Sequence, residues 1–266
     1  MMRALWSAAS GMTSQQLNVD VISNNLANVN TTSFKRDRAE FKDLIYQTLQ
    51  TENVYGGQGK PVNMQVGVGA RPSAIVKDFA EGSLQQTENL FDMALDGEGF
   101  FSVLGPNDKV YYTRDGSFKL SVDGNVATLT TADGYPVLDD GGNPIVFDST
   151  ERDLSVSPLG VISVKNADGT TQEIATLGLY NFTNPAGLLN KGSNLYEPTT
   201  ASGDPGTRDD FQGRMGNVMQ GFLETSNVQV VKEMVDMIAA QRAYEINSKA
   251  IQAADEMLGI ANNLRR

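Results

Sequence analysis

The sequence predicts an α+β protein, in which a helix from each end of the chain pairs as a coiled coil and an antiparallel all-β domain is inserted between them. Three observations lead to this fold class. A heptad repeat of hydrophobic residues runs through residues 5–29, and a second one runs through residues 230–264. Between them lie short β-rich segments that are separated by glycine-containing turns.

The N-terminal repeat predicts a helix with one apolar seam. Its seam is formed by hydrophobic residues at heptad spacing, namely Leu5, Met12, Val19, Leu26, Ile22 and Val29. Arg3 and Asp20 are the only charged residues between positions 3 and 29. Because a helix face in water normally carries charges, we expect this helix to be covered on more sides than one partner helix supplies. An ordinary two-helix hairpin with an unusual polar face is the alternative.

The helix is expected to stop in a run of asparagines. Asn24, Asn25 and Asn28 point away from the seam on the heptad, and Asn30 opens a plausible stop signal. We interpret these amides as contacts to other copies of the chain. Phe34 and the basic residues that follow it are interpreted as a solvated charged face with buried aromatic rings.

The C-terminal repeat predicts a longer helix with a narrow seam. Its bulky seam residues recur at every seventh position, as Val230, Met237, Tyr244, Ile251 and Leu258. Asn247 and alanines at positions 240, 254 and 261 occupy the second seam position. Ser226 and Gln229 are expected to form a capping box at the helix start.

The middle of the chain predicts antiparallel strands from about Phe100 to Phe182. Asp-Gly pairs at 115–116, 123–124, 133–134 and 168–169 predict hairpin turns, because glycine tolerates the positive φ of a tight turn. These patterns divide the chain into three parts. Residues 1–34 with 226–266 form the helical domain, 35–75 with 198–225 form a connecting region of extended or β structure, and 76–197 form the β domain.

Composition excludes several function classes. The net charge is −11, and the sequence has no histidine and no cysteine. The acidity argues against a nucleic-acid partner, and the composition removes common zinc sites, thiol nucleophiles, Ser-His-Asp triads and disulfides. We therefore expect no catalytic residue, metal site, cofactor or small-molecule substrate. No apolar run reaches the roughly 20 residues that span a bilayer, so we expect a soluble chain without a cleaved secretory signal.

Four segments carry a resemblance to a known family. They are "SNNLANVNTTSFK" (23–35), "FKRDRAEFKDLIYQTL" (34–49), "YTRDGSFKL" (112–120) and "ETSNVQVVKEMVDMIAAQRAYEINSKAIQAADEML" (224–258). Together they resemble the bacterial flagellar rod and hook protein family, and most sharply its distal rod members. One position departs from the family pattern, since Ser33 stands where the family usually carries glycine.

The resemblance implies a structural subunit of the distal rod rather than an enzyme. Such a subunit is exported by the flagellar type III apparatus and polymerises into a stiff hollow helical tube. The tube transmits torque from motor to hook and forms part of the export channel. The paired terminal helices form its inner core and the β domain faces outward. Residues 50–72 correspond to a rod-type extension, represented by Gln50, Tyr55, Gly57 and Pro61.

The resemblance also implies partners and a location. The partners are further copies of the chain, proximal rod and hook-family proteins, the export apparatus and, where an outer membrane exists, ring proteins around the rod. The location is the extracytoplasmic basal body. A proximal rod or hook-type subunit is the alternative within the family. A cell-wall-acting enzyme that uses Glu98 or Asp140 is a remote one. In an isolated monomer we expect the terminal helices to be mobile or partly disordered.

Overall fold

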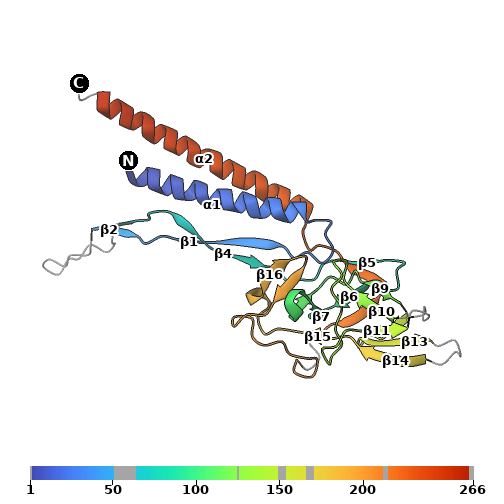
Figure 1. The fold of residues 1–266 in the computed structure, drawn as a ribbon. Helices are drawn as coiled ribbons and strands as arrows, with labels where there is room; N and C mark the ends of the chain where they lie inside the picture. The colour runs from blue at the N-terminus through green and yellow to red at the C-terminus, as the bar shows by residue number, and fades with distance from the viewer. Residues whose placement is uncertain are drawn as a thin grey trace. The chain divides into compact units, whose positions relative to one another are not determined.

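The computed structural model describes residues 2–50, 64–124, 126–148, 154–165, 171–211 and 215–263. A helix at each end of the chain and an all-β region between them confirm the α+β class (Figure 1). The chain divides into two compact units. The first unit comprises Met1–Ala27, Asp37–Lys77 and Gln229–Arg266, and the second comprises Asn28–Arg36 and Asp78–Val228.

The first unit contains both helices. The helix α1 (Met2–Ala27) and the helix α2 (Val230–Asn263) run antiparallel, since Gly11 faces Asn247 while Asn25 is bonded to Glu233. A Cβ atom on Gly11 would lie 2.8 Å from Asn247 Nδ2, so glycine permits the close approach of the two helices there. No helix in the described part of the chain has the length and apolarity to cross a membrane.

The predicted capping box at Ser226 is not formed. The helix α2 begins at Val230, four residues after Ser226, and its first turn is closed by Glu233 N, which donates to Gln229 O at 3.0 Å. Ser226 Oγ instead accepts a hydrogen bond from Val228 N at 3.3 Å. The prediction was wrong because Ser226 stabilises a local turn before the helix rather than the helix terminus.

A β-ribbon forms the third layer of the first unit. Strand β1 (Asp37–Asp43) pairs antiparallel with β4 (Ala70–Lys77), and β2 (Gln47–Gln50) pairs with β3 (Met64–Val66). The β1–β4 ribbon lies against α1 on the side away from α2, so α1 is the middle layer of this unit (Figure 1). Gly69 has φ 127° and precedes β4, where a Cβ atom would overlap Ser10 Oγ.

The second unit contains the all-β region, in which every pairing between described strands is antiparallel. The largest sheet has the order β15-β7-β8-β17-β16. Its strands are β7 (Phe100–Leu104), β8 (Val110–Thr113), β15 (Leu179–Tyr180), β16 (Leu189–Gly192) and β17 (Leu195–Glu197). Phe101 and Val103 of β7 are fully buried in the core that this sheet covers.

Among the described residues of the second unit, the remaining strands form two three-stranded sheets and two strand pairs. The order is β11-β10-β9 in one sheet and β12-β13-β14 in the other, with β18-β6 and β19-β5 as pairs. The bounds are β5 (Leu84–Gln86), β6 (Met93–Asp96), β9 (Lys119–Asp123), β10 (Val126–Thr130), β11 (Val146–Asp148), β12 (Leu154–Val156), β13 (Val161–Lys165), β14 (Thr171–Thr176), β18 (Asn217–Gln220) and β19 (Phe222–Glu224).

The Asp-Gly pairs have different roles in the structure. Asp123 and Gly124 join the paired strands β9 and β10, as predicted. Asp115 and Gly116 do not form a hairpin, because β8 pairs with β7 and β17 whereas β9 pairs with β10. Gly116 O instead accepts a hydrogen bond from Met93 N at 3.0 Å, and a Cβ atom on Gly116 would overlap the backbone of Met93. The 168–169 pair lies outside the described residues.

Candidate assembly surface and buried ion cluster

The buried face of α1 is lined largely by small or polar residues. Of the predicted seam, Ile22 is buried, while Leu5, Met12, Val19, Leu26 and Val29 are half-buried. The most buried positions are Ala8, Ser14, Val21, Ile22 and Asn25. Small side chains suit this face because α1 is packed between α2 and the β1–β4 ribbon.

The contact face of α2 is narrow. Glu233, Ala240 and Ala254 are buried at heptad spacing, and Asn247 is half-buried between them. Of the bulky predicted seam residues, Met237, Ile251 and Leu258 are half-buried, whereas Val230 and Tyr244 are exposed. The helices therefore meet along the small-residue positions, and the bulky side chains lie beside this line.

The ribbon explains why α1 carries so few charges. Ala70 N at the start of β4 donates to Ser10 Oγ at 3.4 Å, and Ser10 Oγ donates to Ser7 O at 2.9 Å. The sequence led us to expect cover beyond one partner helix, and the chain's own ribbon supplies part of that cover. A small-polar face is inexpensive to desolvate when its hydroxyl groups find such partners.

The asparagines at the end of α1 do not share one environment. Asn25 is 1% exposed, and its Nδ2 donates to Asp37 O at 2.8 Å and to Glu233 Oε2 at 3.2 Å. Asn25 Oδ1 accepts from Asp37 N at 2.9 Å, so this amide connects α1, β1 and α2 within one copy. Asn24 and Asn30 are exposed and Asn28 is half-buried. The outward orientation expected of Asn25 is therefore wrong, because its amide satisfies the backbone of β1.

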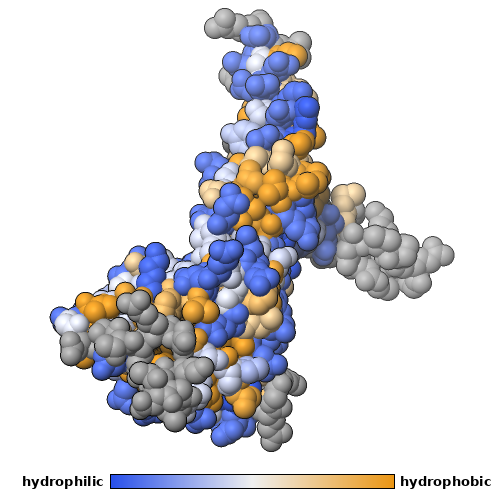
Figure 2. All heavy atoms as spheres, turned by 90° about the vertical axis from the view of Figure 1, so that its right-hand side faces the viewer, coloured by the Kyte–Doolittle hydropathy of each residue, from blue (hydrophilic) through white to orange (hydrophobic). Residues whose placement is uncertain are grey.

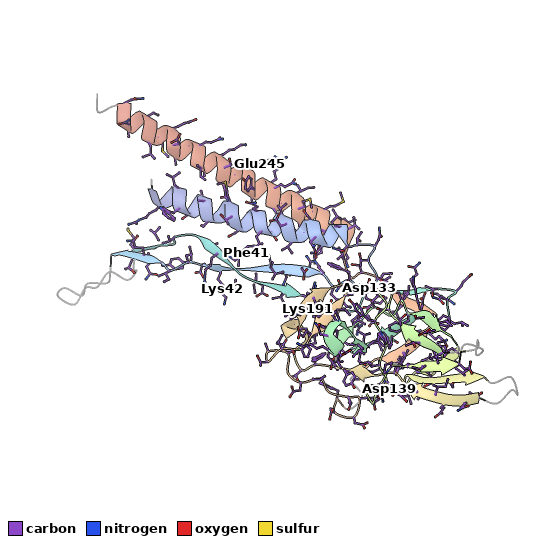
Figure 3. The ribbon with its side chains drawn as sticks, viewed as in Figure 1. Phe41, Lys42, Asp133, Asp139, Lys191 and Glu245 are labelled. Carbon is purple, nitrogen blue, oxygen red and sulfur yellow. The ribbon has the colours of Figure 1, made fainter. Side chains whose placement is uncertain are left out.

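Hydrophobic side chains remain exposed on the first half of α2. Val231, Met234, Val235 and Ile238 follow the spacing i, i+3, i+4, i+7 and are all more than half exposed. We call these four residues the α2 stripe. Figure 2 shows hydrophobic surface gathered on the helical part of the molecule. The ribbon adds exposed Phe41, which Figure 3 places on β1 beside Lys42.

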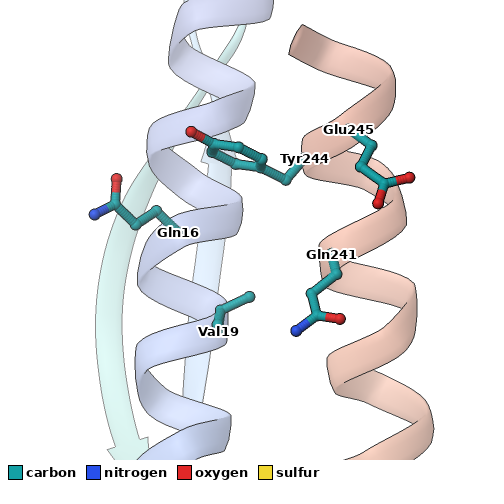
Figure 4. Close-up of a pocket in the computed structure, with 5 residues that line it drawn as sticks. All are labelled: Gln16, Val19, Gln241, Tyr244 and Glu245. Carbon is teal, nitrogen blue, oxygen red and sulfur yellow. The ribbon is translucent and has the colours of Figure 1, made fainter. Parts of the chain in front are cut away.

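A groove lies between the two helices further along. Gln16 and Val19 of α1 and Gln241, Tyr244 and Glu245 of α2 line it, and its volume is about 400 Å³. In Figure 4 the Tyr244 ring extends from α2 towards α1, and Val19 points back towards α2. Val19 and Tyr244 give the groove apolar walls, and Gln16, Gln241 and Glu245 add amide and carboxylate side chains to its lining.

Three buried charges form an ion cluster in the second unit. Lys35 Nζ lies 2.6 Å from Glu224 Oε1, and Arg114 Nε lies 3.1 Å from Glu224 Oε2. All three side chains are at most 4% exposed. One carboxylate thus faces two cations, so the cluster carries a net positive charge.

Backbone groups compensate the charges of the ion cluster. Arg114 NH1 donates to Gly97 O at 2.7 Å and Gly99 O at 2.8 Å, and Lys35 Nζ donates to Ala80 O at 2.9 Å. Burial lowers the pKa of Lys35, and the charge of Arg114 lowers it further. Burial alone would raise the pKa of Glu224, but Arg114 and Lys35 outweigh it and hold that pKa below 4.5.

Ser33 is hydrogen-bonded to the backbone of two residues of the ion cluster. Its φ is 53°, in the left-handed region that glycine adopts without strain. Ser33 N donates to Glu224 O at 2.8 Å, and Ser33 Oγ donates to Arg114 O at 2.9 Å. The buried hydroxyl therefore gains a bond that glycine would lack, which explains how serine is accommodated at this position.

Asn227 ties the same region together from the other side. Its Oδ1 accepts from Arg36 N at 2.8 Å, and its Nδ2 donates to Asp78 O at 2.8 Å and Ala80 O at 3.0 Å. The Phe34 side chain is half-buried. The Phe34 carbonyl accepts a hydrogen bond from Asn227 N at 3.4 Å. The segments "TTSFK", "YTRDG" and "ETSN" therefore converge. The expectation that Lys35 belongs to a solvated face is wrong, because its ammonium is buried beside Glu224, and the sequence predicted no role for Arg114 or Glu224.

Comparison with known proteins gives these motifs a family. Three family models match: "Flagella basal body rod protein" over residues 5–35, "Flagellar hook protein FlgE/F/G D1 domain" over 94–164, and "Flagellar basal body rod FlgEFG protein C-terminal" over 219–264. The flagellar basal-body rod protein FlgG of Borreliella burgdorferi is 48% identical over 100% of both chains. The chain belongs to the flagellar basal-body rod protein family. It is accordingly a structural protein of the flagellar basal body and not an enzyme.

Other members of the rod protein family are similar over the same length. FlgG of Agrobacterium fabrum is 42% identical over 98% of both chains, and FlgG of Bacillus subtilis is 38% identical over 100% of both. A crystal structure of the Helicobacter pylori hook protein FlgE2 aligns with 62% of this chain and 47% of its own. Its identity is 19% and its TM-score 0.25, too low to support any argument.

Two carboxylates considered for wall hydrolysis lie in separate clefts of this rod protein. Glu98 lines a cleft of about 380 Å³ and accepts a hydrogen bond from Asn181 Nδ2 at 3.2 Å. Asp140 lines a different and smaller cleft, of about 140 Å³. The two side chains therefore do not form a carboxylate pair.

The rod-type extension lies largely outside the described residues. Tyr55, Gly57 and Pro61 belong to residues 51–63, which are not described, and Gln50 ends strand β2. The role of this segment stays a prediction.

Proposed function

We propose that the chain is a subunit of the distal rod, which polymerises into a stiff hollow helical tube. The tube would transmit torque from motor to hook and enclose part of the export channel. The observation that carries the proposal is the α2 stripe, a helical row of hydrophobic side chains that a single copy leaves exposed in a protein of the basal-body rod family.

The stripe has the geometry of a helix-binding surface. Residues spaced i, i+3, i+4, i+7 form one face of a helix, and such a face docks against another helix or a groove. Burying one large aliphatic side chain contributes about 1.5–3 kcal/mol. Four such residues supply enough driving force to bring copies together when the interface is repeated along a polymer.

The α1–α2 pair is proposed to act as a coiled coil in the polymer core. The buried positions of α2 recur every seven residues, as a heptad seam requires. The residues proposed to hold this core together are Leu5, Met12, Val19, Ile22, Leu26, Val29, Met237, Tyr244, Asn247, Ile251 and Leu258. Asn24, Asn28 and Asn30 are proposed to contact neighbouring subunits.

The remaining roles follow from the same proposal. The β domain faces outward, and residues 50–72 stiffen the rod. Proximal rod and hook-family proteins bind at the two ends of the tube, the export apparatus delivers the chain, and ring proteins surround the rod where an outer membrane exists. The ion cluster fixes, within the second unit, the segments that continue along the chain into α1 and α2.

A pair of matched variants tests the proposal. Val235 in the stripe and Val122 on strand β9 are both 59% exposed, so Val235→Asp and Val122→Asp place the same charge at equally exposed sites. Val235→Asp should abolish rod formation and swimming when it replaces the chromosomal copy, whereas Val122→Asp should leave both intact. Rods are counted by electron microscopy of isolated basal bodies. Normal rods in the Val235→Asp strain would contradict the proposed interface.

A further inference from the structure

Trp6 is an exposed anchor residue without cover in a single copy. It is the only tryptophan of the chain, and 68% of its surface is exposed on α1. Tryptophan is enriched among the few residues that dominate binding energy at interfaces. Its large ring also gives the greatest gain when it is removed from water.

The groove between α1 and α2 offers a matching cavity. Its volume of about 400 Å³ lies within the range of roughly 300–1,000 Å³ that receives small organic groups. Val19 and the Tyr244 ring give it apolar walls, and the Gln241 amide extends from α2 into the space between the helices, where its oxygen can accept a hydrogen bond, while the polar ends of Gln16 and Glu245 point outward at the rim (Figure 4). An aromatic ring with one N–H donor fits this combination, because the indole Nε1–H needs an acceptor when it is buried.

The charges near Trp6 and at the groove are complementary, which also favours Trp6 as the residue that fills the groove. Arg3 precedes Trp6 by three residues and shares its helix face. Arg3 is the only cation of α1, and Glu245 is the only charged residue among the described residues that line the groove. Glu245 Oε2 is paired with Arg242 NH1 at 3.1 Å in an exposed bridge, and such a bridge is weak enough to be shared or exchanged.

The occupant has to come from another copy. Trp6 precedes Gln16 by ten residues on α1, so it lies about 15 Å away along the helix axis. A side chain cannot cover that distance within its own helix. A second copy that is displaced along the helix direction can place its Trp6 at the groove.

We propose that Trp6 of one copy docks in the Gln16–Val19–Gln241–Tyr244–Glu245 groove of another copy, with Arg3 facing Glu245. The inference rests on the proposed function, since it assumes that copies assemble through the terminal helices. Trp6 and the groove belong to different surfaces of the chain, so the contact is heterologous. A heterologous contact can repeat without closing, as an open helical polymer requires. The α2 stripe takes no part in this contact.

Intrinsic fluorescence tests the docking directly, because Trp6 is the only tryptophan. The purified full-length chain is compared below and above its assembly concentration, with sedimentation as the measure of polymer. In the monomer, acrylamide should quench Trp6 readily. In the polymer, the quenching constant should fall several-fold and the emission should shift to the blue.

Substitutions of Trp6 and of a groove residue provide a second test. Trp6→Ala should weaken assembly about thirtyfold, as loss of a strong interface anchor does, while Trp6→Phe should retain part of the affinity. Tyr244→Ala should leave Trp6 more accessible to acrylamide in whatever polymer forms. Equal assembly by Trp6→Ala and the wild-type chain would overturn the inference.

Cysteine crosslinking identifies the contact independently, since the chain has no cysteine of its own. Arg3→Cys combined with Glu245→Cys keeps Trp6 and Tyr244 and should give a disulfide-linked ladder on oxidation of the polymer. Each single variant should give no ladder. An intramolecular bond is excluded, because residue 3 lies about 20 Å along α1 from Gln16, beyond the ~7 Å Cα separation that a disulfide spans.

The outcomes separate the two proposals. A polymer in which Trp6 stays freely quenched and no ladder forms overturns the docking but leaves the proposed function standing. A wild-type chain that stays monomeric at every concentration contradicts the proposed function, and the docking that rests on it fails as well.

Discussion

Lys35 and Glu224 form a buried ion pair, with 2.6 Å between Nζ and Oε1, although 189 residues separate them along the chain. The pair joins the segment that follows α1 to the segment that precedes α2. Arg114 contacts the other carboxylate oxygen, so a single acidic side chain pairs with cations from two separate motifs. Substitution of a member of the cluster therefore measures how much the cluster contributes to the stability of the second unit.

Replacement of Glu224 by glutamine is expected to destabilise the second unit strongly. Two buried cations would then face each other without a counter-charge, and loss of one partner from a buried ion pair typically costs about 3–5 kcal/mol. Urea denaturation followed by circular dichroism measures the change. The control is Glu40→Gln, which removes an exposed pair with Arg38 and should cost about 0–1 kcal/mol. Similar losses in both variants would contradict the importance of the cluster.

The same carboxylate predicts an acid-dependent loss of stability. The pKa of Glu224 in the folded chain lies below its ordinary value of 4.5, because Arg114 and Lys35 outweigh the effect of burial. A lowered folded pKa contributes stability that is complete above the unfolded pKa and is lost as the pH falls through the folded value. The free energy of unfolding should therefore fall more steeply below pH ~4.5 in the wild-type chain than in Glu224→Gln. Parallel pH profiles would contradict this assignment.

Two small substitutions at Ser33 are expected to have different effects on stability. Ser33→Gly removes a left-handed strain of about 1 kcal/mol and also removes a hydrogen bond of about 1 kcal/mol to Arg114 O, so stability should change little. Ser33→Ala keeps the strain and loses the bond, and should destabilise by about 1 kcal/mol or more. Chemical denaturation distinguishes the two. A glycine variant as unstable as the alanine variant would show that the hydroxyl bond outweighs the strain.

The buried amide of Asn25 is expected to stabilise the first unit. Asn25→Ala would leave the backbone N–H and C=O of Asp37 and the buried Glu233 without this partner, at a cost of about 2 kcal/mol or more. Asn30→Ala is the control, because Asn30 is exposed and its replacement should change the stability of the monomer by less than ~0.5 kcal/mol. Thermal unfolding measures both. Equal losses of stability in the two variants would contradict the stabilising role of the Asn25 amide.

Local patterns were sufficient to predict the helices and most central strands. The heptads at residues 5–29 and 230–264 correspond to α1 and α2, and the Asp123–Gly124 turn joins β9 and β10. The ribbon was harder to predict, because β1 reads "DRAEFKD", in which five of the seven residues are charged and only alanine and phenylalanine are hydrophobic. Its strands are specified by pairing with β4 and by packing on α1, which are contacts between distant segments.

The ion cluster was beyond sequence reasoning for a related reason. Lysine, arginine and glutamate are mostly exposed in proteins, so a composition-based reading places Lys35 and Arg114 at the surface. Their partner Glu224 lies in another motif, and no local spacing reveals the pairing. The only available signal was that the three charged residues fall inside segments that carry the family resemblance. The domain boundaries predicted at residues 34–35, 75–76 and 197–198, and the roles of the assembly residues, stay predictions.

Amide exchange of the isolated monomer tests how far α1 depends on its neighbours. Helices of this kind gain most of their stability from tertiary packing, and α1 is held most firmly near its end, where Val21, Ile22 and Asn25 are buried. Protection should therefore be measurable around residues 21–25 and weak at residues 3–7 and 256–263. Assembly should raise protection across residues 231–238, where the α2 stripe becomes covered. Uniformly strong protection over residues 5–29 in the monomer would contradict the expected mobility, because it would show that one copy already supplies every contact that α1 requires.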